Sequence, residues 1–483
     1  MRRCLYVSAH PDHLLATEPP PTPSNSHALV RQLRLRDLVL AQILTVVGSS
    51  WVGIAAGLGH AQLVAWLISF GLFYTPMGVA VYYLNRDMPL EGGLYVWARR
   101  AFGEASGFMT AWNVWTYGIV VIALLLVQMP SELSYMLGPR AAGLPENKPV
   151  VALLLIAYLL LLALTARRGL ALGKWIHNIS SAAILVAFAL LITAPLWAWA
   201  HSAHHHYAPL AFHLPARDAT SLSLLGQTLF AASGLEYIAI MAGETHAANR
   251  DIGRSVLIAS PVIFLMFVLG TASVLSFHEL HSHIAINYIA PIPQTLSLAF
   301  GNTGWAALLG KLAILLLQIR ILGAASFIFT GVVRLPMAAG WDHLVPEWFA
   351  RLHPRFRTPT NSIWVTTALV AALLILGSAG VRAAEAFAVL NNTSSELYAL
   401  AYVALFLIPL IGRKSLRMRL PRWISLVCAV GLFTTLFVLL FNAYPFLDVA
   451  SPGAFAAKIL GTTLLLNVVG YLFFFLRSRK SAS

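Results

Sequence analysis

The chain has 483 residues, of which 59% are hydrophobic and only 10% are charged, and its mean hydropathy is +0.76. A soluble domain carries about 45–50% apolar and about 25% charged residues, so this composition excludes a soluble enzyme, a nucleic-acid-binding protein and a disordered protein. It indicates a polytopic membrane protein. The two cysteines, Cys4 and Cys428, lie far apart in the sequence and predict neither a disulfide framework nor a metal site.

Twelve apolar runs are each long enough to cross a bilayer, which takes about 20 residues. The lipid interior requires the backbone to satisfy its own hydrogen bonds, so we expect an all-α fold with twelve transmembrane helices. The runs cover residues 38–58, 61–84, 105–130, 149–166, 175–199, 220–243, 255–277, 304–333, 360–380, 385–411, 422–443 and 455–476. Before the first run, residues 1–35 are polar and rich in proline, which predicts a disordered cytoplasmic tail.

The placement of lysine and arginine predicts the orientation of the chain in the membrane. With the N-terminus inside, the inner segments hold 25 of the 32 basic residues and the outer segments hold 5, while Lys311 and Arg320 fall within a span. We therefore expect a multi-pass protein of the cell membrane, plasma or inner, with both termini in the cytoplasm. The net charge of +14 is therefore explained by basic residues on the inner side of the lipid bilayer, and nucleic acid is not expected as a partner.

Small and polar residues interrupt two of the spans near their middle. The first span contains Gly48-Ser49-Ser50-Trp51, and the sixth contains Phe230-Ala231-Ala232-Ser233-Gly234. In transporters, paired breaks in corresponding spans of two halves mark a binding site at the bilayer midplane, where half-helix N-termini face anionic groups. Close helix packing through small residues is the alternative explanation.

These breaks and two further segments resemble the amino acid–polyamine–organocation permeases, a superfamily with the LeuT-type fold. Gly48-Ser49-Ser50 resembles the Gly-x-Gly break of the family, and residues 230–236 with Gly243-Glu244 resemble its second break. Residues 91–103 resemble the cytoplasmic segment between spans two and three. Arg334 and the segment from Asp342 to Pro359 resemble the loop after span eight.

The resemblance implies a 5+5 inverted repeat of spans 1–5 and 6–10 with two peripheral helices. It places a transporter core at 36–412 and the last two helices with a short tail at 413–483. It further implies that Gly48, Ser49 and Ser50 offer N–H groups to a substrate carboxylate. Carbonyl groups of Ala231 to Gly234 would meet the amino group, and Phe230 would close over the substrate. The second glycine of the family pattern is Ser50 here, whose Cβ restricts positive φ angles.

Ionisable residues within a span are costly and usually serve a function. Glu236, at the second break, is the strongest candidate for proton coupling, and capping of the freed N–H groups is its structural alternative. Glu396 lies in a polar stretch of span ten and could pair with Lys311 or Arg320. Arg320 lies deep enough to act in place of a bound sodium ion, whereas Lys311 is expected to snorkel. Tyr117 is the aromatic residue of span three that best fits a pocket.

The sequence therefore predicts a secondary active transporter of amino acids that works by alternating access, as a proton-coupled symporter or an exchanger. A polyamine or organic-cation permease is the alternative. HExxH, GxSxG and Walker motifs are absent, so an enzyme is not expected, and no cofactor is implied. The predicted partners are a small amino acid or amine, protons and the lipid bilayer. The predicted site residues are Gly48, Ser49, Ser50, Trp51, Tyr117, Phe230, Ala231, Ala232, Ser233 and Gly234 for the substrate, and Glu236, Glu396 and Arg320 for coupling.

Overall fold

The computed structural model describes residues 33–88, 93–168, 170–201, 210–235, 245, 248–281, 283–338, 347–354, 356, 358–378, 382–412, 416 and 420–481. Helices make up nearly all of these residues, and β-structure is limited there to one isolated bridge between Leu33 and Thr245. The tail predicted for residues 1–35 falls outside the described residues except for its last three positions. Glu236 also lies outside them.

The first half of the chain forms five predicted spans. The first span is a pair of helices, α1 (Leu35–Val46) and α2 (Ser49–Ala56), bent by 48° at residues 47 and 48. The second span is continuous through η1 (Gly59–Ala61), α3 (Gln62–Ile68), η2 (Ser69–Tyr74) and α4 (Thr75–Asp87). The short helix α5 (Leu94–Phe102) precedes the long spans α6 (Glu104–Leu137), α7 (Lys148–Arg167) and α8 (Leu170–His201), with η3 (Pro139–Ala141) and η4 (Leu144–Glu146) between α6 and α7.

The second half begins with a short helix, α9 (Ala219–Ala231), that ends at the predicted break. The further helices are α11 (Ala248–Leu280), α12 (Pro291–Phe300), α13 (Gly304–Ala338), α14 (Glu347–Ala350), α15 (Thr360–Ser378), α16 (Ala383–Leu407) with η7 (Ile408–Gly412), α17 (Arg422–Phe441) and α18 (Pro452–Ser481). Helix α12 was not predicted, because its ten residues are too few for a membrane span and the apolar runs were selected by their length.

The helices are compatible with the twelve predicted spans. Within the described ranges, nine helices and the bent pair α1–α2 are long and apolar enough to cross a membrane, and they match ten of the predicted runs. The other two runs are represented by α9, which covers the first part of the run 220–243, and by the shorter apolar helix α15; residues 236–243 lie outside the described ranges.

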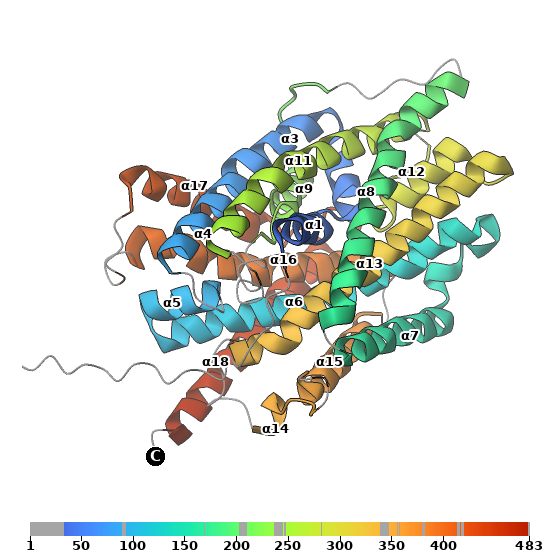
Figure 1. Cartoon of the computed structure of the whole chain (residues 1–483). Coiled ribbons are helices and arrows are strands. Elements are labelled where there is room, and N and C mark those ends of the chain that lie inside the picture. Colours follow the sequence, from blue (N-terminus) through green and yellow to red (C-terminus); the bar gives the residue numbers. More distant parts are fainter. Residues whose placement is uncertain are drawn as a thin grey trace, which may run out of the picture.

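Helices α6, α13 and α16 form the centre of the bundle, and α1 packs against α8, α11 and α13 (Figure 1). In the most apolar part of α6, 83% of the residues are buried inside the protein, compared with 33% in α17 and 17% in α18. A helix that is apolar on all sides can be buried on all sides, and α6 has this character from Gly107 to Met129. The last two helices are therefore peripheral, as the resemblance implied.

Candidate functional site

The first break separates α1 from α2. Val47 and Gly48 are extended, with ψ angles of 111° and 144°, and Ser49 begins the second half-helix. Glycine and serine are poor helix formers, so a break forms here at little cost. The interruption leaves carbonyl groups at the end of α1 and N–H groups at the start of α2 without helical partners.

Gly48 is required at the break because the indole of Trp51 lies directly over it. A Cβ atom on residue 48 would stand 2.6 Å from Cδ1 and 2.9 Å from Nε1 of Trp51. Ser50 is buried within the helical turn of α2, so it needs no positive φ angle. The expected penalty for serine in place of the family's second glycine therefore does not arise.

Arg320 of α13 lies against the first break. Its side chain is only 3% exposed, and Nη2 donates a hydrogen bond to the Val47 carbonyl over 2.5 Å. The same nitrogen is 3.6 Å from the position of a Cβ on Gly48. Arg320 therefore holds a buried positive charge at the C-terminal end of α1, where the helix dipole favours a cation.

Glu132 of α6 is a site residue that the sequence analysis missed. Its side chain is fully buried, and it faces the Arg320 guanidinium and the Ser49 hydroxyl. Gln318 donates to Glu132 Oε2 over 3.4 Å. The predicted third span ended at residue 130 and so did not include Glu132. A helix of 34 residues carries it instead, and a carboxylate directly after such a long apolar run was the available signal.

Glu396 of α16 is buried but lies elsewhere. It faces the side chain of Asn442, the residue that caps the end of α17, so the predicted pairing with Lys311 or Arg320 is wrong. The reason is geometric: α16 presents Glu396 toward α17, and the charge next to Arg320 comes from α6. Sequence spacing could not decide which helices these faces would meet.

A network of buried amides extends from Glu396 to α9. Gln227 donates to the side-chain oxygens of Asn392 and Asn442, and Asn391 donates to Gln227 over 2.8 Å. Asn392 and Asn442 also exchange hydrogen bonds with each other's backbone carbonyls, over 2.7 and 2.8 Å. The half-helix before the second break is thereby fixed to α16 and α17.

The second break follows α9. Gly234 has a φ angle of +107°, a conformation that side-chain-bearing residues rarely adopt. Its N–H donates to the Tyr402 hydroxyl over 2.9 Å, and the Ser233 N–H donates to the Phe230 carbonyl. A Cβ on Gly234 would stand 3.8 Å from Cγ2 of Val46, the last residue of α1. The two breaks therefore meet in space.

Aromatic rings surround the second break. Phe230 is 2% exposed, and its ring centroid lies 5.8 Å from that of Tyr398 and 6.0 Å from that of Tyr402. Tyr117 stacks on Tyr398 at 3.8 Å. The structure thus brings the predicted Phe230 and Tyr117 together through two tyrosines of α16 that were not predicted. Their spacing of four residues, one helical turn, was the available signal.

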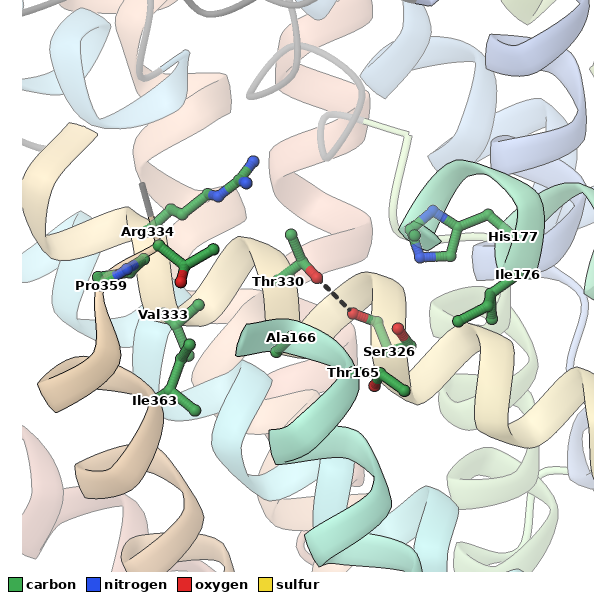
Figure 2. Close-up of a pocket in the computed structure, with 12 residues that line it drawn as sticks. Thr165, Ala166, Ile176, His177, Ser326, Thr330, Val333, Arg334, Pro359 and Ile363 are labelled. Carbon is green, nitrogen blue, oxygen red and sulfur yellow. Dashed lines mark hydrogen bonds between the residues drawn. The ribbon is translucent and has the colours of Figure 1, made fainter. Parts of the chain in front are cut away.

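A separate narrow cavity lies between α7, α8, α13 and α15 and contains none of the predicted site residues (Figure 2). His177, which is 8% exposed, and Arg334 are among its lining residues. Thr330 donates there to the Ser326 carbonyl over 2.8 Å. The cavity has room for about one water molecule, which is too little for an amino acid.

Among the described histidines outside the membrane-spanning core, His60 makes an ionic contact. His60 Nε2 lies 3.5 Å from Glu279, and its ring centroid is 6.0 Å from that of His213. Over the described ranges, no group of three histidine, cysteine or acidic side chains is arranged to hold a metal ion.

Comparisons with known proteins agree with this architecture. The sequence profile of the family described as amino acid permease matches residues 38–470. The chain is 22% identical to the serine/threonine exchanger of Bacillus subtilis, over 67% of this chain and 70% of that protein. It is 25% identical to a probable agmatine/putrescine antiporter of Lactococcus lactis, over 48% of each chain.

Among solved structures, MhsT in complex with L-phenylalanine superimposes with a TM-score of 0.63 at 13% identity. The match covers 85% of this chain and 98% of that one, and MhsT has the LeuT-type fold. The profile covers most of the chain and the fold agrees with it. This protein therefore belongs to the amino acid permease family and is a multi-pass membrane transporter, not an enzyme.

Proposed function

We propose that this protein is a secondary active transporter that moves amino acids across the cell membrane by alternating access, with both termini in the cytoplasm. The observation that carries the proposal is the meeting of two helix breaks beside a buried charge. Gly234 of the second break approaches Val46 at the end of α1, and Arg320 lies beside Gly48. An amino acid carries one negative and one positive group, and two such breaks offer oppositely polarised backbone ends to them.

In this proposal the N–H groups at the start of α2 bind the substrate carboxylate. These groups belong to Gly48, Ser49 and Ser50, and Trp51 closes one side. Carbonyl groups of Ala231, Ala232, Ser233 and Gly234 accept hydrogen bonds from the amino group. Phe230 and Tyr117 lie in an aromatic cluster that would enclose the side chain of the substrate.

Proton coupling belongs to the same proposal. Arg320 acts as a resident cation at the Val47 carbonyl, a position from which a mobile metal ion would be repelled. A buried carboxylate that gains and loses a proton is then the natural coupling group. Glu396, whose Oε1 has no hydrogen-bond partner among the described residues, is one candidate for this role, and Glu236 is a candidate outside them.

A polyamine or organic-cation permease is the second candidate. Two observations favour it: the buried carboxylates Glu132 and Glu396, and the similarity to a probable agmatine/putrescine antiporter. In this case the carboxylates would bind ammonium groups of the substrate, and no substrate carboxylate would reach α2.

Uptake of radiolabelled L-arginine, L-serine, L-phenylalanine, agmatine and putrescine into proteoliposomes tests the proposal. L-arginine and agmatine form a matched pair, because agmatine is arginine without its carboxylate. We expect uptake of at least one of the three amino acids, stimulated by an inwardly directed proton gradient and abolished by a protonophore, and no uptake of the two amines. Uptake of agmatine or putrescine with none of the amino acids would favour the second candidate.

A further inference from the structure

Two buried charges of opposite sign stand at the first break, on different helices. Glu132 is 0% exposed and Arg320 is 3% exposed. They come from α6 and α13, two long helices that pack against each other in the centre of the bundle. Charges within a membrane span are retained where they are paired or where they serve a function. The binding of an amino acid by backbone groups alone requires neither of them.

Each member of this pair keeps unused hydrogen-bonding capacity. Nε and Nη1 of Arg320 and Oε1 of Glu132 have no hydrogen-bond partner among the described residues. Arg320 uses Nη2 for the Val47 carbonyl, and Glu132 uses Oε2 for Gln318. Glu132 and Arg320 interact electrostatically, but no direct salt bridge joins them in the described structure. Both side chains can therefore accept a further ionic group.

A substrate carboxylate at the first break would compete with Glu132 for the same positive charges. Arg320 Nη2 lies 3.6 Å from the Cβ position of Gly48, beside the N-terminus of α2. Glu132 faces the hydroxyl of Ser49, the first residue of that helix. Two carboxylates that share one site cannot readily both remain ionised, and one of them binds a proton instead.

We propose that Glu132 is a proton-binding residue of the transport cycle, and that the substrate carboxylate replaces the Glu132 carboxylate as the counter-ion of Arg320. The inference rests on the proposed amino acid transport and specifies its coupling. In the empty site, ionised Glu132 balances Arg320. During loading, Oε1 of Glu132 takes one proton from water on the loading side, and the zwitterionic substrate brings its carboxylate to Arg320. One proton and one amino acid thus move together, and one positive charge crosses per cycle.

The groups around Glu132 allow this exchange. Arg320 and Gln318 of α13 and Ser49 of α2 face it, and on its own helix Tyr135 is engaged by Asn287. Two other carboxylates are buried in the described spans: Glu396 of α16 faces Asn442 and belongs to the amide network, and Asp37 of α1 accepts hydrogen bonds from the Arg34 N–H and from Asn178. Among the described residues, Arg320 is therefore the charged group whose electrostatic interaction changes when Glu132 gains or loses a proton.

The decisive variant is Glu132→Gln, which mimics the protonated state. Wild-type protein and the variant are reconstituted with L-arginine, L-serine and L-phenylalanine as the probes. We expect the variant to lose accumulation driven by a proton gradient while it retains exchange of internal for external amino acid. Substrate affinity in the wild type should change by up to about tenfold per pH unit where one proton is linked. In the variant it should be independent of pH. Glu146→Gln, on the exposed segment after α6, is the matched control and should behave as the wild type.

Gradient-driven accumulation by Glu132→Gln with the pH dependence of the wild type would overturn the inference and leave amino acid transport intact. Loss of the pH dependence of substrate affinity in Glu396→Gln or Glu236→Gln, but not in Glu132→Gln, would also overturn the inference and leave amino acid transport intact. Failure of the wild type to transport any of the three amino acids would instead refute the proposed function. If Glu132→Gln does not fold, the charge-free pair Glu132→Gln with Arg320→Gln replaces it. That protein should bind L-arginine no better than agmatine, and a retained preference for L-arginine would contradict the inference.

Discussion

The two helix breaks meet in space but have different surroundings. The first break lies among charges, with Arg320 on the Val47 carbonyl and Glu132 facing Ser49. The second lies among rings, with Phe230 packed against Tyr398 and Tyr402. Both breaks arise from runs of small residues, so their sequences alone make them look alike. The difference comes from the neighbouring helices, α6 and α13 on one side and α16 on the other.

This contrast assigns a separate part of substrate recognition to each break. A charged environment that excludes water discriminates strongly between ionic groups, because an unpaired buried charge is costly. An aromatic environment encloses apolar and planar groups of several shapes. We therefore expect changes at the first break to abolish or strongly reduce transport and changes at the second to alter affinity and selectivity.

Replacement of Arg320 by methionine should have the largest effect. The substitution keeps an unbranched side chain but leaves Glu132 buried without its counter-charge, which costs about 3–5 kcal/mol. We expect loss of transport and a clear fall in the apparent melting temperature of the detergent-purified protein. Lys311→Met, half-buried on the same helix, is the matched control and should change neither.

The combination of Arg320→Met with Glu132→Gln sharpens this test. Without either charge the core has no uncompensated ion, so stability should return while transport stays absent. A double variant as unstable as Arg320→Met would show that the guanidinium stabilises the fold through the Val47 carbonyl alone.

Replacement of Gly48 by alanine should have the next largest effect. The new methyl group would stand 2.6 Å from Cδ1 of Trp51, so the indole must move away from the break. Overpacking of this kind costs about 1–3 kcal/mol, and we expect uptake to fall about tenfold. Addition of Trp51→Ala should relieve the clash and restore folding. Gly461→Ala, at an open position on α18, is the control. Normal uptake by Gly48→Ala would indicate that Trp51 does not have to occupy its observed position.

The sequence predicted much of this site, and its omissions have identifiable causes. The positions of both breaks followed from Gly48 to Ser50 and from Ala231 to Gly234, since poor helix formers in the middle of a span are a local signal. Glu132 was missed because the predicted third span ended at residue 130, whereas the helix continues to Leu137. A local sequence pattern does not indicate which residue of another helix lies next to a buried charge. The expected pairing of Glu396 with Arg320 or Lys311 was wrong for this reason.

Tyr402→Phe should give the smallest effect and tests the second break directly. The ring stays in the aromatic cluster, but the Gly234 N–H loses the hydroxyl that accepts its hydrogen bond over 2.9 Å. One hydrogen bond contributes about 1 kcal/mol, which is about fivefold in affinity. We expect the concentration for half-maximal uptake to rise by about that factor, with the maximal rate and the proton dependence unchanged. Tyr471→Phe, on the exposed face of α18, is the matched control. Complete loss of transport in Tyr402→Phe would contradict the division of roles, because a neutral hydroxyl at the second break would then matter as much as the charge at the first.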